Sequence, residues 1–89
     1  MRLPWRPQRA VTVFTRSGCG LCREAEGMVA REAGGHRVEH VDVDADPTLQ
    51  RAYNIRVPVV EVDGVEVAEG RLEAGVVRAA LRSPRPPSG

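Results

Sequence analysis

Residues 11–22 read VTVFTRSGCGLC, and this stretch determines how the rest of the chain is interpreted. Its first five residues are β-branched or apolar, which is typical of a short buried strand. Ser17 and Gly18 then break the strand, and Cys19 and Cys22, the only two cysteines of the chain, follow three positions apart. The stretch therefore predicts a turn from a strand into a helix, with both thiols at that turn.

Apolar residues continue at helical spacing after the turn. Leu21, Ala25, Met28 and Val29 fall on one helix face, and Gly34-Gly35 ends the pattern. Residues 37–44 alternate valine with polar residues, which indicates a half-buried strand, and we expect it at an edge of the sheet.

The second half of the chain carries clear turn signals. Asp46-Pro47 predicts an N-cap and first turn of a short helix that runs through Tyr53. Residues 57–62 and 65–67 predict two strands joined by a type I′ turn at Asp63-Gly64. Apolar spacing predicts a last helix that includes Leu72, Val76, Ala79 and Ala80.

The expected order is β-α-β-α-β-β-α, an α/β fold. The first β-α-β unit requires a parallel pair and the hairpin an antiparallel pair, so we expect a mixed four-stranded sheet. Residues 10–82 form the predicted domain, between a flexible leader (1–9) and a disordered, proline-rich tail (83–89).

Composition excludes several classes of function. The 13 basic residues, all arginine, nearly balance 12 acidic ones, so the net charge of +1 predicts neither nucleic acid nor a membrane as partner. No segment has the length of an apolar membrane span or a secretory signal, and we expect a cytoplasmic protein. Structural disulfides rarely persist in that compartment, so the two cysteines indicate redox or metal chemistry.

The predicted positions of the two thiols suit disulfide exchange. Cys19 lies at the helix N-terminus, where unpaired backbone N–H groups and the helix dipole stabilise a thiolate. Cys22 lies one turn further along and should be more buried. Gly18 and Gly20 leave Cys19 open to a protein-sized disulfide. We therefore expect Cys19 to attack a substrate disulfide and Cys22 to resolve the mixed disulfide.

Two other interpretations of the cysteines remain open from the residues alone. Cys19, Cys22, His36 and His40 have a spacing close to that of a zinc finger. His36, however, follows the glycine break, and His40 falls in a predicted strand, so we expect no metal ligands. A buried packing pair would not require the neighbouring glycines.

The stretch from Val11 to Cys22, followed by REAE, resembles the first strand and active-site helix of glutaredoxins. Arg56-Val57-Pro58, the Asp63-Gly64 hairpin and Gly70 are similar to further parts of that family, and the likeness extends over residues 11–81. The small bacterial glutaredoxin-like proteins with a CxLC centre are the most similar. The resemblance implies a thioredoxin-like fold and a cis peptide before Pro58, facing the thiols.

The resemblance also implies which residues contact the substrate: Arg16, Gly20, Leu21, Val57, Pro58 and Gly70. Arg16 stands where the family often has lysine, and it either meets a carboxylate of a small thiol or is simply solvated. In the turn of residues 69–73 that corresponds to the glutathione site, Gly70 and Glu73 match the family, whereas Glu69 and Leu72 depart from it. We therefore expect glutathione to bind poorly, with Arg71 pairing with Glu69 or with another carboxylate.

The resulting prediction is a monomeric thiol-disulfide oxidoreductase that reduces disulfide-containing proteins. We expect no bound cofactor, and a low-molecular-weight thiol or thioredoxin reductase as electron donor. Two alternatives belong to other classes. Two subunits could share an iron–sulfur cluster through Cys19 and external thiols, because one chain cannot supply four sulfur ligands. The chain could also be a non-enzymatic interaction module.

Overall fold

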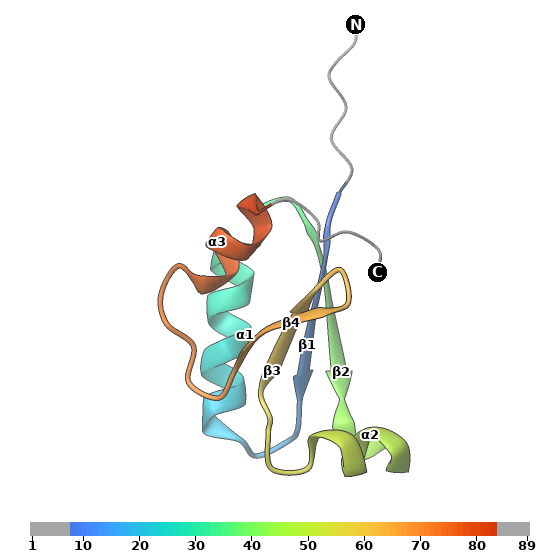
Figure 1. Ribbon diagram of the computed structural model, residues 1–89. Coiled ribbons are helices and arrows are strands. Elements are labelled where there is room, and N and C mark those ends of the chain that lie inside the picture. Colours follow the sequence, from blue (N-terminus) through green and yellow to red (C-terminus); the bar gives the residue numbers. More distant parts are fainter. Residues whose placement is uncertain (1–7, 84–89) are drawn as a thin grey trace, which may run out of the picture.

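A mixed sheet of four strands, in the order β2-β1-β3-β4, forms the centre of the computed structural model, which describes residues 8–83 (Figure 1). The two central strands are β1 (Ala10–Thr15) and β3 (Val59–Val62), and the edges are β2 (Arg37–Asp42) and β4 (Val65–Glu69). β1 is parallel to β2 and antiparallel to β3, and β3 is antiparallel to β4. The predicted α/β class, element order and edge position of β2 are confirmed.

Three helices connect and cover these strands. α1 (Gly20–Glu32) forms the crossover from β1 to β2 and packs beside α3 (Val76–Arg82) on one face of the sheet (Figure 1). A 3-10 turn, η1 (Val43–Ala45), and α2 (Pro47–Tyr53) follow β2. No helix among residues 8–83 is long and apolar enough to cross a membrane.

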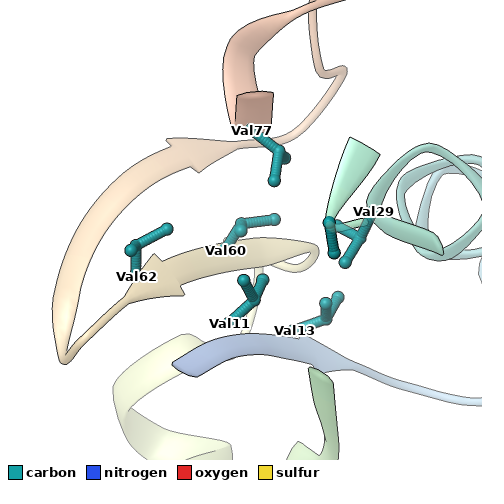
Figure 2. Packing of buried hydrophobic residues seen from close by; sticks show 7 residues of the cluster. Val11, Val13, Val29, Val60, Val62 and Val77 are labelled. Carbon is teal, nitrogen blue, oxygen red and sulfur yellow. The ribbon is translucent and has the colours of Figure 1, made fainter. Parts of the chain in front are cut away.

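The main core lies between the sheet and the α1–α3 layer and consists mostly of valine (Figure 2). Alternate residues of each central strand point into it, because side chains along a strand alternate between faces. The buried members are Val11, Val13, Val29, Ala33, Val60, Val62 and Val77. Such β-branched side chains have few rotamers to lose on burial, which suits a small domain with few aromatic residues.

A smaller cluster covers the other face of the sheet. Phe14, Val43 and Val59 form its buried centre. The ring of Tyr53, at the end of α2, stacks on Phe14 with a centroid distance of 4.5 Å and an interplanar angle of 17°. This contact fixes α2 against the end of β1 from which the loop with the thiols leaves.

Several predicted boundaries are confirmed and others move. Asp46 caps α2 as predicted, because its carboxylate accepts a hydrogen bond from the Thr48 N–H at 2.8 Å. Asp63 and Gly64 both have positive φ, as a type I′ turn requires. β2 ends at Asp42 rather than at residue 44, because the Asp42 carboxylate accepts from the Asp44 N–H and begins η1.

In the second half of the chain, β3 begins at Val59, two residues later than predicted, and β4 extends to Glu69. The prediction that places Leu72 in the last helix is wrong, because α3 begins at Val76. The Glu32 carboxylate, at the end of α1, sets this boundary. It accepts hydrogen bonds from the N–H groups of Gly75, Val77 and Arg78 at 2.6, 3.0 and 3.0 Å.

Burial favours a higher pKa for Glu32, but the three N–H groups outweigh it and hold the pKa of this carboxyl below its usual value. Glu32 thus acts as an N-cap supplied from a distant part of the chain, where Gly75, the residue at the cap position, has no side chain to serve.

Arg9 joins the folded unit, although the sequence assigns it to the leader. Its guanidinium pairs with Asp63 at 2.7 Å and donates to the carbonyl groups of Leu81 and Ser83 at 3.1 and 2.6 Å. Gln8 also makes a contact, with the Gly35 carbonyl at 2.6 Å. The rest of the predicted leader (1–7) and tail (84–89) lies outside the described residues.

Candidate active site

Cys19 and Cys22 lie at the start of α1, as the sequence predicts. Cys19 is the N-cap, and its Sγ accepts a hydrogen bond from the Cys22 N–H at 3.1 Å. The Cys19 side chain is partly exposed, whereas Cys22 is 1% exposed. The two sulfurs are not joined in a disulfide. One sulfur is therefore open to a substrate, and the other is shielded behind it.

The environment of Cys22 keeps its thiol protonated. Burial raises the pKa of Cys22 to about 11, and the hydrogen bond and charge of Cys19 add to the effect. A backbone hydrogen bond from Arg16 acts in the opposite direction but does not cancel it. The pKa of Cys22 would fall if the Cys19 sulfur no longer carried charge, and a thiolate at Cys22 would then form more readily.

Arg16 is the first residue of the thiol loop, residues 16–19, which joins β1 to α1, and its side chain is already bound to groups of the protein itself. Its guanidinium pairs with the Asp44 carboxylate at 3.0 Å and donates to the Asn54 carbonyl at 2.8 Å. The Arg16 hydrogen bond is the largest influence on Asp44, and it lowers the pKa of that carboxyl. Arg16 is therefore not a freely solvated cation, and its contact with a carboxylate of a small thiol stays a prediction.

A shallow pocket of about 250 Å³ opens beside the thiol loop on the β2 side. It is lined by two arginines, two acidic residues and small polar residues: Thr15, Arg16, Ser17, Gly18, Arg23, Glu26 and Asp42. The charges of its lining balance, so the pocket has no strong preference for an anion.

The Val57-Pro58 peptide is cis, as the resemblance implies. Pro58 is buried and Val57 is half-buried. Phe14 pairs with Val59, so the register places Pro58 at the end of β1 from which the thiol loop departs. Gly70 lies next to it, since its N–H donates to the Pro58 carbonyl at 2.8 Å. Three of the predicted substrate-contact residues thus gather at the thiol end of the sheet.

Gly20 and Leu21 separate the two cysteines in the first turn of α1. Gly20 is exposed and Leu21 half-buried. The histidines lie elsewhere. Nδ1 of His36 accepts a hydrogen bond from the Arg9 N–H at 2.9 Å, and His40 faces solvent on β2. Within residues 8–83 no three His, Cys, Asp or Glu side chains come together as a metal site.

Arg56 was expected only as part of the resemblance and not as a site residue, but it organises the segment before Pro58. Its guanidinium pairs with both Glu66 and Glu69 of β4 and lies over the Tyr53 ring, 5.6 Å from its centroid. The pKa of Arg56 is raised, first by the hydrogen bond to Glu66 and then by the one to Glu69. These pairs depend on the register of β3 and β4, which short-range sequence patterns do not reveal.

The 69–73 turn differs from the expectation in one respect. Glu69 pairs with Arg56 at 3.2 Å, whereas Arg71 lies 3.8 Å from the Glu24 carboxylate on α1. The predicted pairing of Arg71 with Glu69 is therefore wrong, and its alternative, a different carboxylate, holds. Leu72 packs against the main core, which explains an apolar residue at this position.

Residues 10–82 match the family model of the glutaredoxin-like domain (DUF836). The chain belongs to this glutaredoxin-like family. The match includes both cysteines and every residue of the predicted substrate contacts. No curated protein matches the sequence.

Solved structures agree with the assignment of this chain to the glutaredoxin-like family. A structural genomics target protein from X. campestris is 33% identical, with a TM-score of 0.68 over 80% of this chain and 93% of that one. Protein Ne2328 from Nitrosomonas europaea is 29% identical, with a TM-score of 0.68 over 89% and 98%. A mutant thioredoxin from Halobacterium salinarum is 28% identical, with a TM-score of 0.62 over 82% and 71%. The thioredoxin-like fold is confirmed, and together with the Cys19–Cys22 pair it indicates a redox function.

Proposed function

We propose that this protein is a thiol-disulfide oxidoreductase that reduces disulfides of other proteins. The carrying observation is the unequal setting of the two thiols, one partly exposed at a helix N-terminus and one buried directly behind it. The Cys22 N–H stabilises negative charge on the Cys19 sulfur, which favours the thiolate that attacks disulfides.

The proposed reaction has two exchange steps. The Cys19 thiolate attacks one sulfur of the substrate, its disulfide bond breaks, and the departing thiolate takes a proton. Cys19 is then neutral and joined to the substrate. Loss of the Cys19 charge removes one of the causes that raise the pKa of Cys22. Cys22 then loses its proton, attacks the Cys19 sulfur and releases the second substrate thiol.

This cycle transfers two electrons and leaves a Cys19–Cys22 disulfide, which an external reductant must reopen. We infer that a low-molecular-weight thiol or a reductase supplies these electrons. Arg16 and Arg56, two cations at the thiol end, already pair with carboxylates of the protein, so an anionic thiol would have to displace them. This favours an electron donor that does not need its own carboxylates to pair with Arg16 or Arg56.

Trapping distinguishes this function from the alternatives. The Cys22→Ser variant should accumulate a mixed disulfide with insulin whose disulfides are intact, because no resolving thiol remains. Mass spectrometry detects this mixed disulfide. The Cys19→Ser variant should form none at neutral pH. With dithiothreitol as reductant, wild-type protein should accelerate insulin reduction and Cys19→Ser should not. A fully active Cys19→Ser variant would refute the proposal.

A further inference from the structure

Ile55 is a large apolar side chain that the fold leaves in solvent. It is 89% exposed, whereas Val65, the other exposed large apolar residue of the part described, is 44% exposed. Single exposed apolar residues are common and need no function by themselves. The position of Ile55 and the way its segment is held are what give it meaning.

The segment that carries Ile55 touches the thiol loop. It links α2 to β3, between Tyr53 and Pro58. The Arg16 guanidinium, at the start of the thiol loop, donates to the carbonyl of Asn54 at 2.8 Å. Ile55 is the next residue, so it lies at the same end of the sheet as Cys19. Val65 follows the Asp63-Gly64 turn, at the opposite end of β1, where Asp63 contacts the N–H of Ala10.

Contacts fix this segment on both sides of Ile55. Arg16 holds Asn54 and is itself anchored by Asp44. On the other side, the Arg56 guanidinium is bound to β4, and the Arg56 N–H donates to the Tyr53 carbonyl at 2.9 Å. The backbone of the segment is therefore preorganised while the Ile55 side chain remains uncovered, which lowers the entropic cost of binding a partner there.

The charges around Ile55 favour an apolar partner. Both flanking arginines are matched by carboxylates of the protein, so the surface offers an aliphatic side chain between two satisfied ion pairs. A disulfide in a protein is flanked by residues that extend past its sulfurs, whereas a small disulfide has little to place there. We infer that Ile55 is a docking contact for protein substrates, bound through an apolar residue near the substrate cysteine. This inference rests on the proposed oxidoreductase function.

The test compares a protein disulfide with a small one. Ile55→Ala, Val65→Ala and wild-type protein are assayed with insulin and with bis(2-hydroxyethyl) disulfide, dithiothreitol being the reductant in both cases. We expect Ile55→Ala to reduce kcat/KM for insulin by about five- to fiftyfold, mainly through KM, because a buried aliphatic contact is lost. Activity on the small disulfide should stay within about twofold, and Val65→Ala should resemble wild type on both.

The outcomes separate this inference from the function on which it rests. Equal insulin reduction by Ile55→Ala and wild type would overturn the docking role and leave the oxidoreductase function standing. If the wild-type protein reduced the small disulfide but not insulin, the docking role would also be overturned. A wild-type protein inactive on both disulfides would refute the proposed function, and the docking role with it. A dimer that Ile55→Ala dissociates would assign the side chain to a second copy of the chain and likewise overturn the inference. Thermal unfolding verifies that the variant remains folded.

Discussion

The Cys22 N–H donates a hydrogen bond to the Cys19 sulfur at 3.1 Å, while the Cys22 sulfur is buried beneath the same helix turn. The pair is therefore chemically unequal even before a substrate arrives. The Cys19 sulfur accepts a hydrogen bond at a partly exposed position, whereas burial opposes charge on Cys22. A helix whose N-cap is the first cysteine produces both effects at once.

The two thiols should accordingly differ in alkylation rate. At pH 7, Cys19 in the Cys22→Ser variant should react with iodoacetamide at least tenfold faster than Cys22 in the Cys19→Ser variant. The Cys22 rate should still be rising above pH 9, because burial, the largest cause of its raised pKa, persists in that variant. Mass spectrometry at a series of pH values measures both rates. Faster reaction of Cys22 near pH 6 would reverse the assigned roles.

The dithiol should be a mild reductant. A hydrogen-bonded Cys19 sulfur stabilises the reduced form, so we expect a reduction potential of roughly −200 to −270 mV. Equilibration of the protein with dithiothreitol buffers of known ratio measures it. A potential below roughly −300 mV would instead indicate a structural disulfide.

Glu32→Gln should destabilise the fold by about 1 kcal/mol at pH 7, because an amide accepts fewer of the three N–H hydrogen bonds at the start of α3. The pKa of Glu32 is lower in the folded than in the unfolded state, whose value is near 4.5. Its contribution is therefore present above that unfolded value and is lost as the pH falls through the folded one.

Urea unfolding at pH 7 and pH 3 tests this expectation, since the difference between wild type and Glu32→Gln should narrow at pH 3. Glu24→Gln, an exposed substitution in the same helix, serves as the control and should change stability by less than about 0.5 kcal/mol. Equal effects of the two variants at pH 7 would show that the capping bonds contribute nothing measurable.

Glutathione should be a poor electron donor. Leu72 offers no polar contact in the turn, and Glu69 adds negative charge that Arg56 shares with Glu66. Loss of two charge-assisted hydrogen bonds, at about 1.5–3 kcal/mol each, weakens binding more than tenfold. Steady-state reduction of a glutathionylated peptide by glutathione measures this against an ordinary dithiol glutaredoxin.

Glu69→Gln should improve that activity, whereas Glu39→Gln, the same charge change on the opposite edge strand, should not. Catalytic efficiency of the wild-type protein equal to that of the ordinary glutaredoxin would contradict this prediction.

Short-range signals predicted much of this structure. The Asp46 cap, the Asp63-Gly64 turn and the helix that starts between the cysteines each depend on neighbours a few residues away, so the sequence displays them. The cis peptide before Pro58 followed only from family resemblance, because most bonds before proline are trans.

The features that the sequence analysis missed depend on distant partners. Leu72 has helical spacing to Val76, but Glu32 starts the helix later through bonds that span more than 40 residues. Arg56 meets Glu66 and Glu69 only after β3 and β4 have paired. Ile55 belongs to no periodic pattern, so nothing local distinguishes it from a buried aliphatic residue.

The Arg9 guanidinium, bound to the last carbonyls of α3 and to the hairpin turn, bears on how the protein can be shortened or fused. Family similarity begins at residue 10, one position too late to include this cation. A truncated form that starts at residue 10 would keep the whole sheet and the core contacts of α3, yet lose these Arg9 contacts with the end of α3 and with the hairpin turn. The boundary of sequence similarity therefore leaves out a residue that joins the hairpin turn to the end of α3 in the folded chain.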